Sequence, residues 1–195
     1  MSSSQETQEH LHHAQHAPSN KKVAILIIAL AAFLAIMEMG GKSAQTTALN
    51  QNIEAANLWN FFQAKTIRMT VMRTAAEGLE AEGGEGLAPE KAERLAKRAA
   101  QWKETAARYD SEPSTNEGRK ELMARAKAAE AVRDKALSAY HLFEYASAAL
   151  QLAIVLASAA VITEMALLAF IGAGLGGLGL ILGLIGWFAP TLIHL

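Results

Sequence analysis

The sequence contains no cysteine, so disulfide bonds and metal sites built from thiolates are excluded. Proline is also scarce, with four residues among 195, whereas alanine is abundant. Few residues that break helices, and few runs of β-branched residues outside the apolar segments, are typical of helical proteins. The sequence therefore predicts an all-α fold.

Charge is nearly absent from the C-terminal quarter of the chain. Between Tyr145 and Leu195 there is no lysine or arginine, and Glu164 is the only acidic residue. This segment is too long for a single crossing of a hydrocarbon core about 30 Å thick, which about 20 helical residues span. Two transmembrane helices joined at Glu164 are therefore expected. Their predicted bounds are residues 145–163 and 165–188, followed by a short tail at residues 189–195.

A third apolar segment lies near the N-terminus, at residues 21–41. Lys21-Lys22 precede fifteen uninterrupted apolar residues, which Glu38 follows. The segment is long enough to cross a bilayer, so it is predicted to form the first transmembrane helix. A cleaved signal peptide is the alternative, but no small-residue cleavage pattern directly follows the apolar run. Glu38 precedes Lys42 by four residues, which favours an ion pair, although an acid inside a span is also a functional candidate.

The glycines of the last span are regularly spaced. Their intervals of 4, 3, 4 and 3 residues place five of them on one helix face, where another backbone can approach closely. Each glycine costs a water-soluble helix about 1 kcal/mol relative to alanine, whereas close packing compensates this cost in a bilayer. Gly174 and Gly177 form a second thin face, open to a neighbouring subunit. The predicted helix-packing residues are Gly172, Gly176, Gly179, Gly183, Gly186 and, on the second span, Ala153 and Ala157.

The same region contains the GxGxxG spacing of dinucleotide-binding proteins, from Gly172 to Gly177. That fingerprint requires a preceding strand, a following helix and an acidic residue about twenty positions downstream. Here the glycines lie inside an apolar span, and no acid follows them. No cofactor is therefore predicted.

Residues 1–20 are polar and rich in histidine, and they are predicted to form a mobile tail. His12 and His16 are four residues apart, which would place both on one face of a helix, the usual spacing for a shared metal ion. A solvated tail without metal is the competing interpretation, because His-rich tracts are only a compositional signal.

Residues 42–144 are predicted to form an extramembrane stalk of three helical, coiled-coil-like segments. Breaks are expected at Gly83–Gly86 and at Asp110–Pro113, with Pro89 in the first turn of the second segment. Asn116 is a candidate cap for the third segment. The first span and the first stalk segment are candidates for a single rod with a hinge at residues 40–41.

Each stalk segment has apolar residues at helical spacing, but these stripes are narrow, which favours self-association. In the first segment they are Leu58, Phe62, Met69, Met72, Ala76 and Leu79, widened by Ile53, Ile67 and Val71. In the second they are Leu95, Ala99, Trp102, Ala106 and Tyr109, and in the third Leu122, Ala126, Ala129, Val132 and Ala136.

Charges of both signs alternate along the stalk, with sixteen basic and fourteen acidic residues between Lys42 and Tyr140. Because no stripe is purely basic, nucleic acid is not an expected partner. The aromatic cluster around Trp59 and Phe62, with Lys65 one turn further, is a possible partner surface. Packing against the other stalk helices is the simpler interpretation.

The stretch GGKSAQTTALNQNIEAANLWNFFQAKTIRMTVMRTA, together with QLAIVLASAAVIT and the glycine-rich final span, resembles a bacterial inner-membrane protein family, the domain of unknown function family 4337. This resemblance implies a tail, one span, a helical middle and two further spans, and it implies no activity or cofactor. The residues most similar to the family pattern are Asn57, Trp59, Phe62, Gln63, Ala64 and Lys65.

No nucleophile–base pair or metal constellation is visible, so an enzyme is not predicted. The first hypothesis is a structural or scaffold protein that forms a homo-oligomer in the lipid bilayer. A channel or small transporter is the alternative, with Gln151, Ser158, Glu38 and Glu164 as pore candidates. An accessory subunit that binds other membrane proteins through the region of Trp59 is the third possibility.

The expected location is the bacterial inner membrane, as the resemblance implies. Five basic residues near the spans on the stalk side, against Lys21-Lys22 on the other side, favour a cytoplasmic stalk and C-terminus. Long loops determine orientation only weakly, and the first span often dominates, which argues for the reverse.

Overall fold

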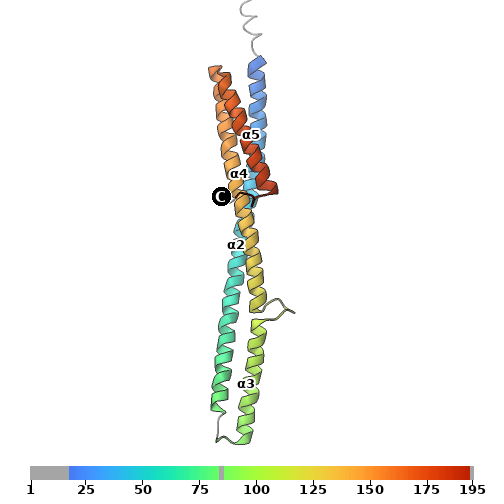
Figure 1. Cartoon of the computed structure of the whole chain (residues 1–195), viewed down its shortest axis with the longest axis vertical. Coiled ribbons are helices and arrows are strands. Elements are labelled where there is room, and N and C mark those ends of the chain that lie inside the picture. Colours follow the sequence, from blue (N-terminus) through green and yellow to red (C-terminus); the bar gives the residue numbers. More distant parts are fainter. Residues whose placement is uncertain (1–17, 84–85, 194–195) are drawn as a thin grey trace, which may run out of the picture. The chain divides into compact units, whose positions relative to one another are not determined.

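A computed structural model describes residues 18–83 and 86–193, and their secondary structure is entirely helical (Figure 1). Within these described residues four helices follow one another, and they are labelled as in the figure. They are α2 (Pro18–Glu82), α3 (Pro89–Asp110), α4 (Arg119–Thr163) and α5 (Ala166–Phe188). The predicted all-α class is confirmed.

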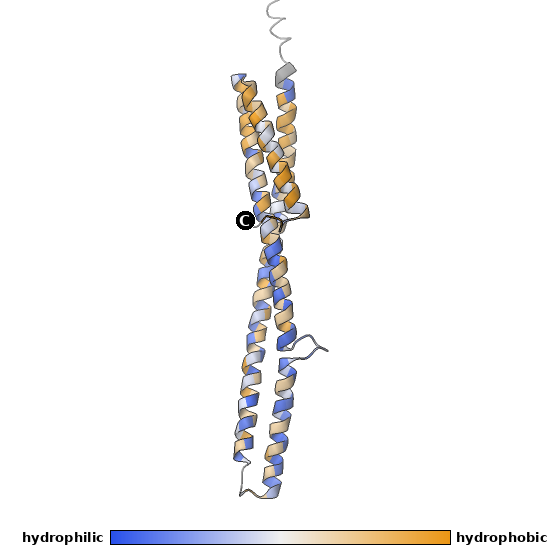
Figure 2. Ribbon diagram, in the orientation of Figure 1, coloured by the Kyte–Doolittle hydropathy of each residue, from blue (hydrophilic) through white to orange (hydrophobic). Residues whose placement is uncertain are grey.

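Three of these helices, α2, α4 and α5, are long and apolar enough to cross a membrane. Figure 2 shows α5 as hydrophobic over its whole length, whereas α3 is largely polar. The apolar window of α2 lies near the N-terminus, as the sequence predicts. The number of candidate spans is therefore confirmed for the described residues.

The helix ends follow local sequence signals. Pro89 is in the first turn of α3, where its missing N–H would have no helical partner, and α3 ends at Asp110, three residues before Pro113. Between α4 and α5, Glu164 has a φ of 55°, a left-handed conformation that turns the chain. The predicted breaks are confirmed, and α5 begins one residue later than expected.

Two local predictions are wrong. The first span and the first stalk segment do form one continuous helix, as expected, but α2 passes through Gly40 and Gly41 without the predicted hinge. A Cβ at Gly40 would lie 3.0 Å from the Phe143 ring, so this glycine makes room for an aromatic side chain. Asn116 does not cap α4, because it lies three residues before Arg119 in a turn with a φ of 56°.

The chain divides into two compact units. The first comprises residues 1–48 and 135–195, and in its described part segments of α2 and α4 pack with α5. Its core consists of aliphatic side chains, alanines and one aromatic ring, with small residues where the helices approach one another. The buried members are Leu30, Met37, Phe143, Ala146, Leu150 and Ala153.

The second unit comprises residues 49–134, where α3 and the first part of α4 pack along α2. Its buried cluster is small and rich in alanine, with Trp59 and Phe62 packed against it. The buried members are Ala55, Leu58, Leu122, Ala126 and Ala129. A core built mostly from alanine buries little apolar area, so its burial contributes little free energy.

Part of the predicted apolar stripe is exposed. Ile53, Ile67 and Val71 are 51%, 65% and 57% exposed, so they do not widen the buried face of α2. Ile67 lies two residues from the buried Met69, about 200° around the helix, which places it on the opposite side. Val132 of α4 is likewise 47% exposed.

Candidate functional site

The glycine stripe of α5 lies against the two other helices of the first unit, and all five glycines are buried. Three of them face α4. A Cβ at Gly172 would lie 2.9 Å from the Ala153 carbonyl oxygen, and a Cβ at Gly179 would lie 2.9 Å from that of Ala146. Such distances leave no room for a side chain.

The two remaining glycines of the stripe face α2. A Cβ at Gly176 would collide with the Leu30 side chain, and one at Gly183 would collide with Met37. The glycines of the stripe therefore face α4 and α2 in turn. A stripe that packed only against the alanines of the second span would face α4 alone. Ala153 and Ala157 are fully buried and lie beside Gly172.

Gly174 and Gly177 lie on a different face of α5. A Cβ at either position would meet nothing within 4 Å. This face is therefore open among the described residues, and its contact with a neighbouring subunit stays a prediction.

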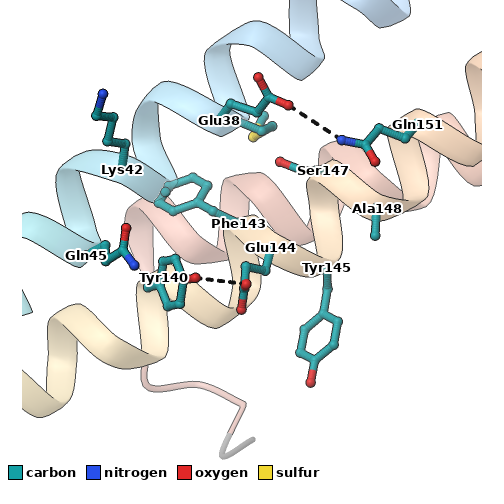
Figure 3. Close-up of a pocket in the computed structure, with 12 residues that line it drawn as sticks. Glu38, Lys42, Gln45, Tyr140, Phe143, Glu144, Tyr145, Ser147, Ala148 and Gln151 are labelled. Carbon is teal, nitrogen blue, oxygen red and sulfur yellow. Dashed lines mark hydrogen bonds between the residues drawn. The ribbon is translucent and has the colours of Figure 1, made fainter.

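A polar groove of about 670 Å³ lies between α2 and α4 of the first unit, and Figure 3 shows its lining side chains. We call it the polar groove. It contains carboxylates, amides, one lysine, one hydroxyl from serine and three aromatic rings. Its lining residues are Met37, Glu38, Gly41, Lys42, Gln45, Tyr140, Phe143, Glu144, Tyr145, Ser147, Ala148 and Gln151.

At one end of the polar groove, Glu38 of α2 meets Gln151 of α4 (Figure 3). Gln151 Nε2 donates a long hydrogen bond of 3.5 Å to Glu38 Oε1. The carboxylate thus keeps most of its hydrogen-bonding capacity for other donors. The structure brings together two of the four predicted pore candidates.

The other two pore candidates lie elsewhere. Ser158 Oγ donates a 2.8 Å hydrogen bond to the Ile154 carbonyl oxygen of its own helix. Glu164 is exposed in the turn between α4 and α5. Neither lines the polar groove.

At the other end of the polar groove, Glu144 is held by side chains of its own helix. The Tyr140 hydroxyl donates a 2.8 Å hydrogen bond to Glu144 Oε1, and His141 Nδ1 lies 3.5 Å from Glu144 Oε2. No sequence motif singles out these three residues. The four-residue spacing of Tyr140 and Glu144 is a weak signal, and only the packing of α4 on α2 places these two residues in one groove with Glu38.

The three residues predicted as a possible partner surface face the interior of the second unit. Trp59 Nε1 donates a 2.8 Å hydrogen bond to Glu130 of α4, and the Phe62 ring lies 5.0 Å from the Arg119 guanidinium. Lys65 is only 6% exposed. Packing within the chain, the simpler of the two interpretations, is the arrangement observed.

Lys65 is a buried cation with unusual surroundings. Its ammonium lies 5.3 Å from the ring centres of both Phe61 and Tyr109, and 3.8 Å from a Glu117 carboxylate oxygen. Two aromatic faces and a carboxylate replace the water that burial removes. Lys65 therefore connects α2 with α3 and with the loop that precedes α4.

Ion pairs stabilise the corner between α3 and α4. Arg119 lies 2.8 Å from Asp110 and also donates to the Thr66 hydroxyl of α2. A hydrogen bond from Lys120, with the charges of Lys120 and Arg119, lowers the pKa of the Asp110 carboxyl below its usual range. These contacts connect the corner to α2.

The predicted metal ligands His12 and His16 lie outside the described residues. Within residues 18–83 and 86–193, no group of three or more histidine, cysteine, aspartate or glutamate side chains could hold a metal ion.

The structure defines a helical protein with three candidate membrane spans and a small polar groove beside them. A family described as a domain of unknown function (DUF4337) matches residues 19–189, and the chain belongs to that family. The resemblance to family 4337 seen in the sequence is thus confirmed. No curated protein and no solved structure matches the chain.

Proposed function

We propose that the chain is an integral membrane protein of the bacterial inner membrane that associates with copies of itself and acts as a structural scaffold, without enzymatic activity. One observation carries the self-association. A long exposed face of α2 in the second unit contains no charged residue, and we call it the uncharged face. It consists of Leu49, Asn50, Ile53, Ala56, Asn57, Asn60, Gln63, Ile67, Thr70, Val71 and Thr74.

An uncharged face of this length is unusual for a helix that is solvated on that side. The same stretch of α2 carries exposed charges at Glu54 and Arg73, outside the uncharged face, and at Arg68, at its edge. Exposed faces of soluble helices normally carry the charges, whereas a face that meets another helix does not. The uncharged face therefore has the composition of a helix interface.

A second copy of the chain fits this face better than an unrelated helix. Copies inserted in one membrane with the same orientation run parallel and in register. Ile53, Asn60 and Ile67 recur every seven residues, so each would meet its own counterpart. We call this line of Ile53, Asn60 and Ile67 the seam. An asparagine between two isoleucines at such a position favours a parallel dimer in one register, at a cost in stability.

The absence of cysteine allows a direct test. Asn60→Cys should give a disulfide-linked dimer on mild oxidation in membranes, because the two thiols would face each other across the seam. Ala124→Cys on an exposed face of α4 is the matched control and should remain monomeric. Equal cross-linking of the two variants would contradict a seam along α2.

A second test asks whether the seam is needed for assembly. Ile53→Lys combined with Ile67→Lys should shift the detergent-solubilised particle to lower mass, because like charges would meet across the seam. Ala124→Lys combined with Ala131→Lys adds the same charge to exposed sites of α4. A mass that both double variants leave unchanged would rule out the seam.

Transport is a second candidate function, favoured by the contact of Glu38 with Gln151. An ionisable residue within a span is often part of an ion or proton pathway. Reconstituted protein should then show flux that Glu38→Gln abolishes. If Glu38→Gln leaves the flux unchanged, the contact of Glu38 with Gln151 no longer supports transport. Recruitment of another membrane protein through Trp59 has less support, since that side chain is turned inward.

A further inference from the structure

The contact between Glu38 and Gln151 lies within the expected thickness of a bilayer. Glu38 is 16 residues beyond Lys22 on α2, or about 24 Å along the helix axis. Gln151 is 12 residues before the end of α4 at Thr163, or about 18 Å. A hydrocarbon core about 30 Å thick that begins at Lys22 and Thr163 therefore encloses both side chains. This placement rests on the membrane insertion proposed above.

The direction of α2 prevents Glu38 from reaching water easily. Side chains on a helix lean toward its N-terminus, which on α2 is the end at Lys22. The Glu38 carboxylate is thus directed further into the span, not toward the nearer boundary at Lys42. A charge at that depth requires a partner. Among the described residues, Glu38 has only the neutral amide of Gln151, at 3.5 Å.

Besides its one lysine, Lys42, the rest of the polar groove offers hydrogen-bond acceptors and aromatic rings. Ser147 contributes a hydroxyl, and Gln151 retains its carbonyl oxygen, while Glu144 supplies a second carboxylate nearer the boundary (Figure 3). Tyr140 and Phe143 present aromatic rings, which attract cations at their faces. An ammonium group with three hydrogens can donate to several of these oxygens at once.

We propose that the polar groove binds a primary ammonium group between Glu38 and Glu144. Three features favour this ligand: the acceptors, the rings and a volume of about 670 Å³. A metal ion fits less well, because the described residues contain no cluster of three metal-ligating side chains. The ammonium comes either from the headgroup of an aminophospholipid or from a soluble amine.

The phospholipid source is tested with the full chain in nanodiscs. Discs of phosphatidylcholine with and without phosphatidylethanolamine differ only in whether the headgroup has a primary or a quaternary ammonium. The primary amine should raise the unfolding temperature, because ligands that bind only the folded state stabilise it. Glu38→Gln should reduce the amine affinity about tenfold, the effect of losing a charge-assisted hydrogen bond.

The soluble source is tested in detergent with 1,4-diaminobutane, against tetramethylammonium and sodium at the same ionic strength. Trp187 fluorescence provides a second signal, since its ring lies 5.7 Å from Phe143, which lines the polar groove. Glu164→Gln removes a carboxylate from the turn between α4 and α5 and should leave both responses unchanged. A response to phosphatidylethanolamine alone identifies the lipid, and a response to diaminobutane alone identifies a soluble amine.

Several results would overturn the site. They are equal stabilisation by quaternary amines or sodium, no stabilisation by either primary amine, or an amine response that Glu38→Gln leaves intact. Circular dichroism of the variant separates loss of binding from loss of fold. Extraction from membranes with alkaline carbonate tests insertion itself. An inserted protein without amine selectivity contradicts the ligand site alone, whereas an extracted protein contradicts the proposed membrane function.

Discussion

At the scale of single residues, the glycines of this chain serve different purposes. Those of the α5 stripe permit close helix packing, and Gly40 makes room for the Phe143 ring. Gly118 has a third role, at the corner between α3 and α4. A Cβ there would collide with the Glu121 carboxylate and the Glu112 backbone nitrogen, and it would lie 2.7 Å from Ser111 Cα. The regular spacing identified the first group in the sequence, whereas an isolated glycine gives no such signal.

Gly118→Ala should destabilise the second unit by about 1–3 kcal/mol, the usual cost of overpacking. Its Cβ would displace Glu121, which accepts hydrogen bonds from the Ser111 hydroxyl and the Glu112 N–H. Gly78→Ala is the matched control. It adds a Cβ that meets nothing within 4 Å, so it should stabilise α2 by about 1 kcal/mol. Chemical denaturation of the two variants measures both effects, and a neutral result at position 118 would contradict this role.

The ion pairs of Asp110 predict that the free energy of unfolding depends on pH. Its pKa is lowered in the folded protein, so its stabilising contribution is complete above the pKa of an unfolded aspartate, about 4, and is lost as the pH falls further. The free energy of unfolding should therefore decrease below about pH 4, and Asp110→Asn should reduce this dependence. Glu82→Gln, at the exposed end of α2, is the control. An unchanged pH profile in Asp110→Asn would show that other carboxyls dominate.

At the scale of elements, helix ends were predictable where a proline or a turn of the chain required them. Pro89 and Glu164 mark such places. A single rod from the first span into the stalk was predictable, but the absence of a hinge at Gly40 was not, because paired glycines usually favour a bend. Packing of Phe143 over this position stabilises the straight helix, and that contact comes from α4.

The two glycine faces of α5 should respond differently to alanine. Gly179→Ala places a Cβ 2.9 Å from the Ala146 carbonyl oxygen and should lower the unfolding temperature in detergent. Gly177→Ala meets nothing within 4 Å and should not lower it. Substitution of Gly177 by leucine then tests assembly, since a larger side chain on this face would alter the particle mass only if a neighbour packs there. Equal destabilisation at the two positions would contradict the assignment of the faces.

At the scale of the whole molecule, three spans would place the stalk and the turn between α4 and α5 on opposite sides of the membrane. Single cysteines introduced by Asn116→Cys and Glu164→Cys report both sides, because the chain has no other thiol. With a cytoplasmic stalk, an impermeant maleimide should label only position 164 in intact cells. The reverse labelling would invert the orientation, and equal labelling of both would contradict three spans.

The sequence by itself determined the helical class, the number of candidate spans and the glycine stripe. These depend on composition, run length and periodicity, which are properties of neighbouring residues. Tertiary structure decided what each face meets. It turned Trp59, Phe62 and Lys65 inward, left Ile67 exposed, and brought Glu38 to Gln151, 113 positions away. Periodicity specifies which residues share a face, but only the rotation of one helix against another decides which face is buried.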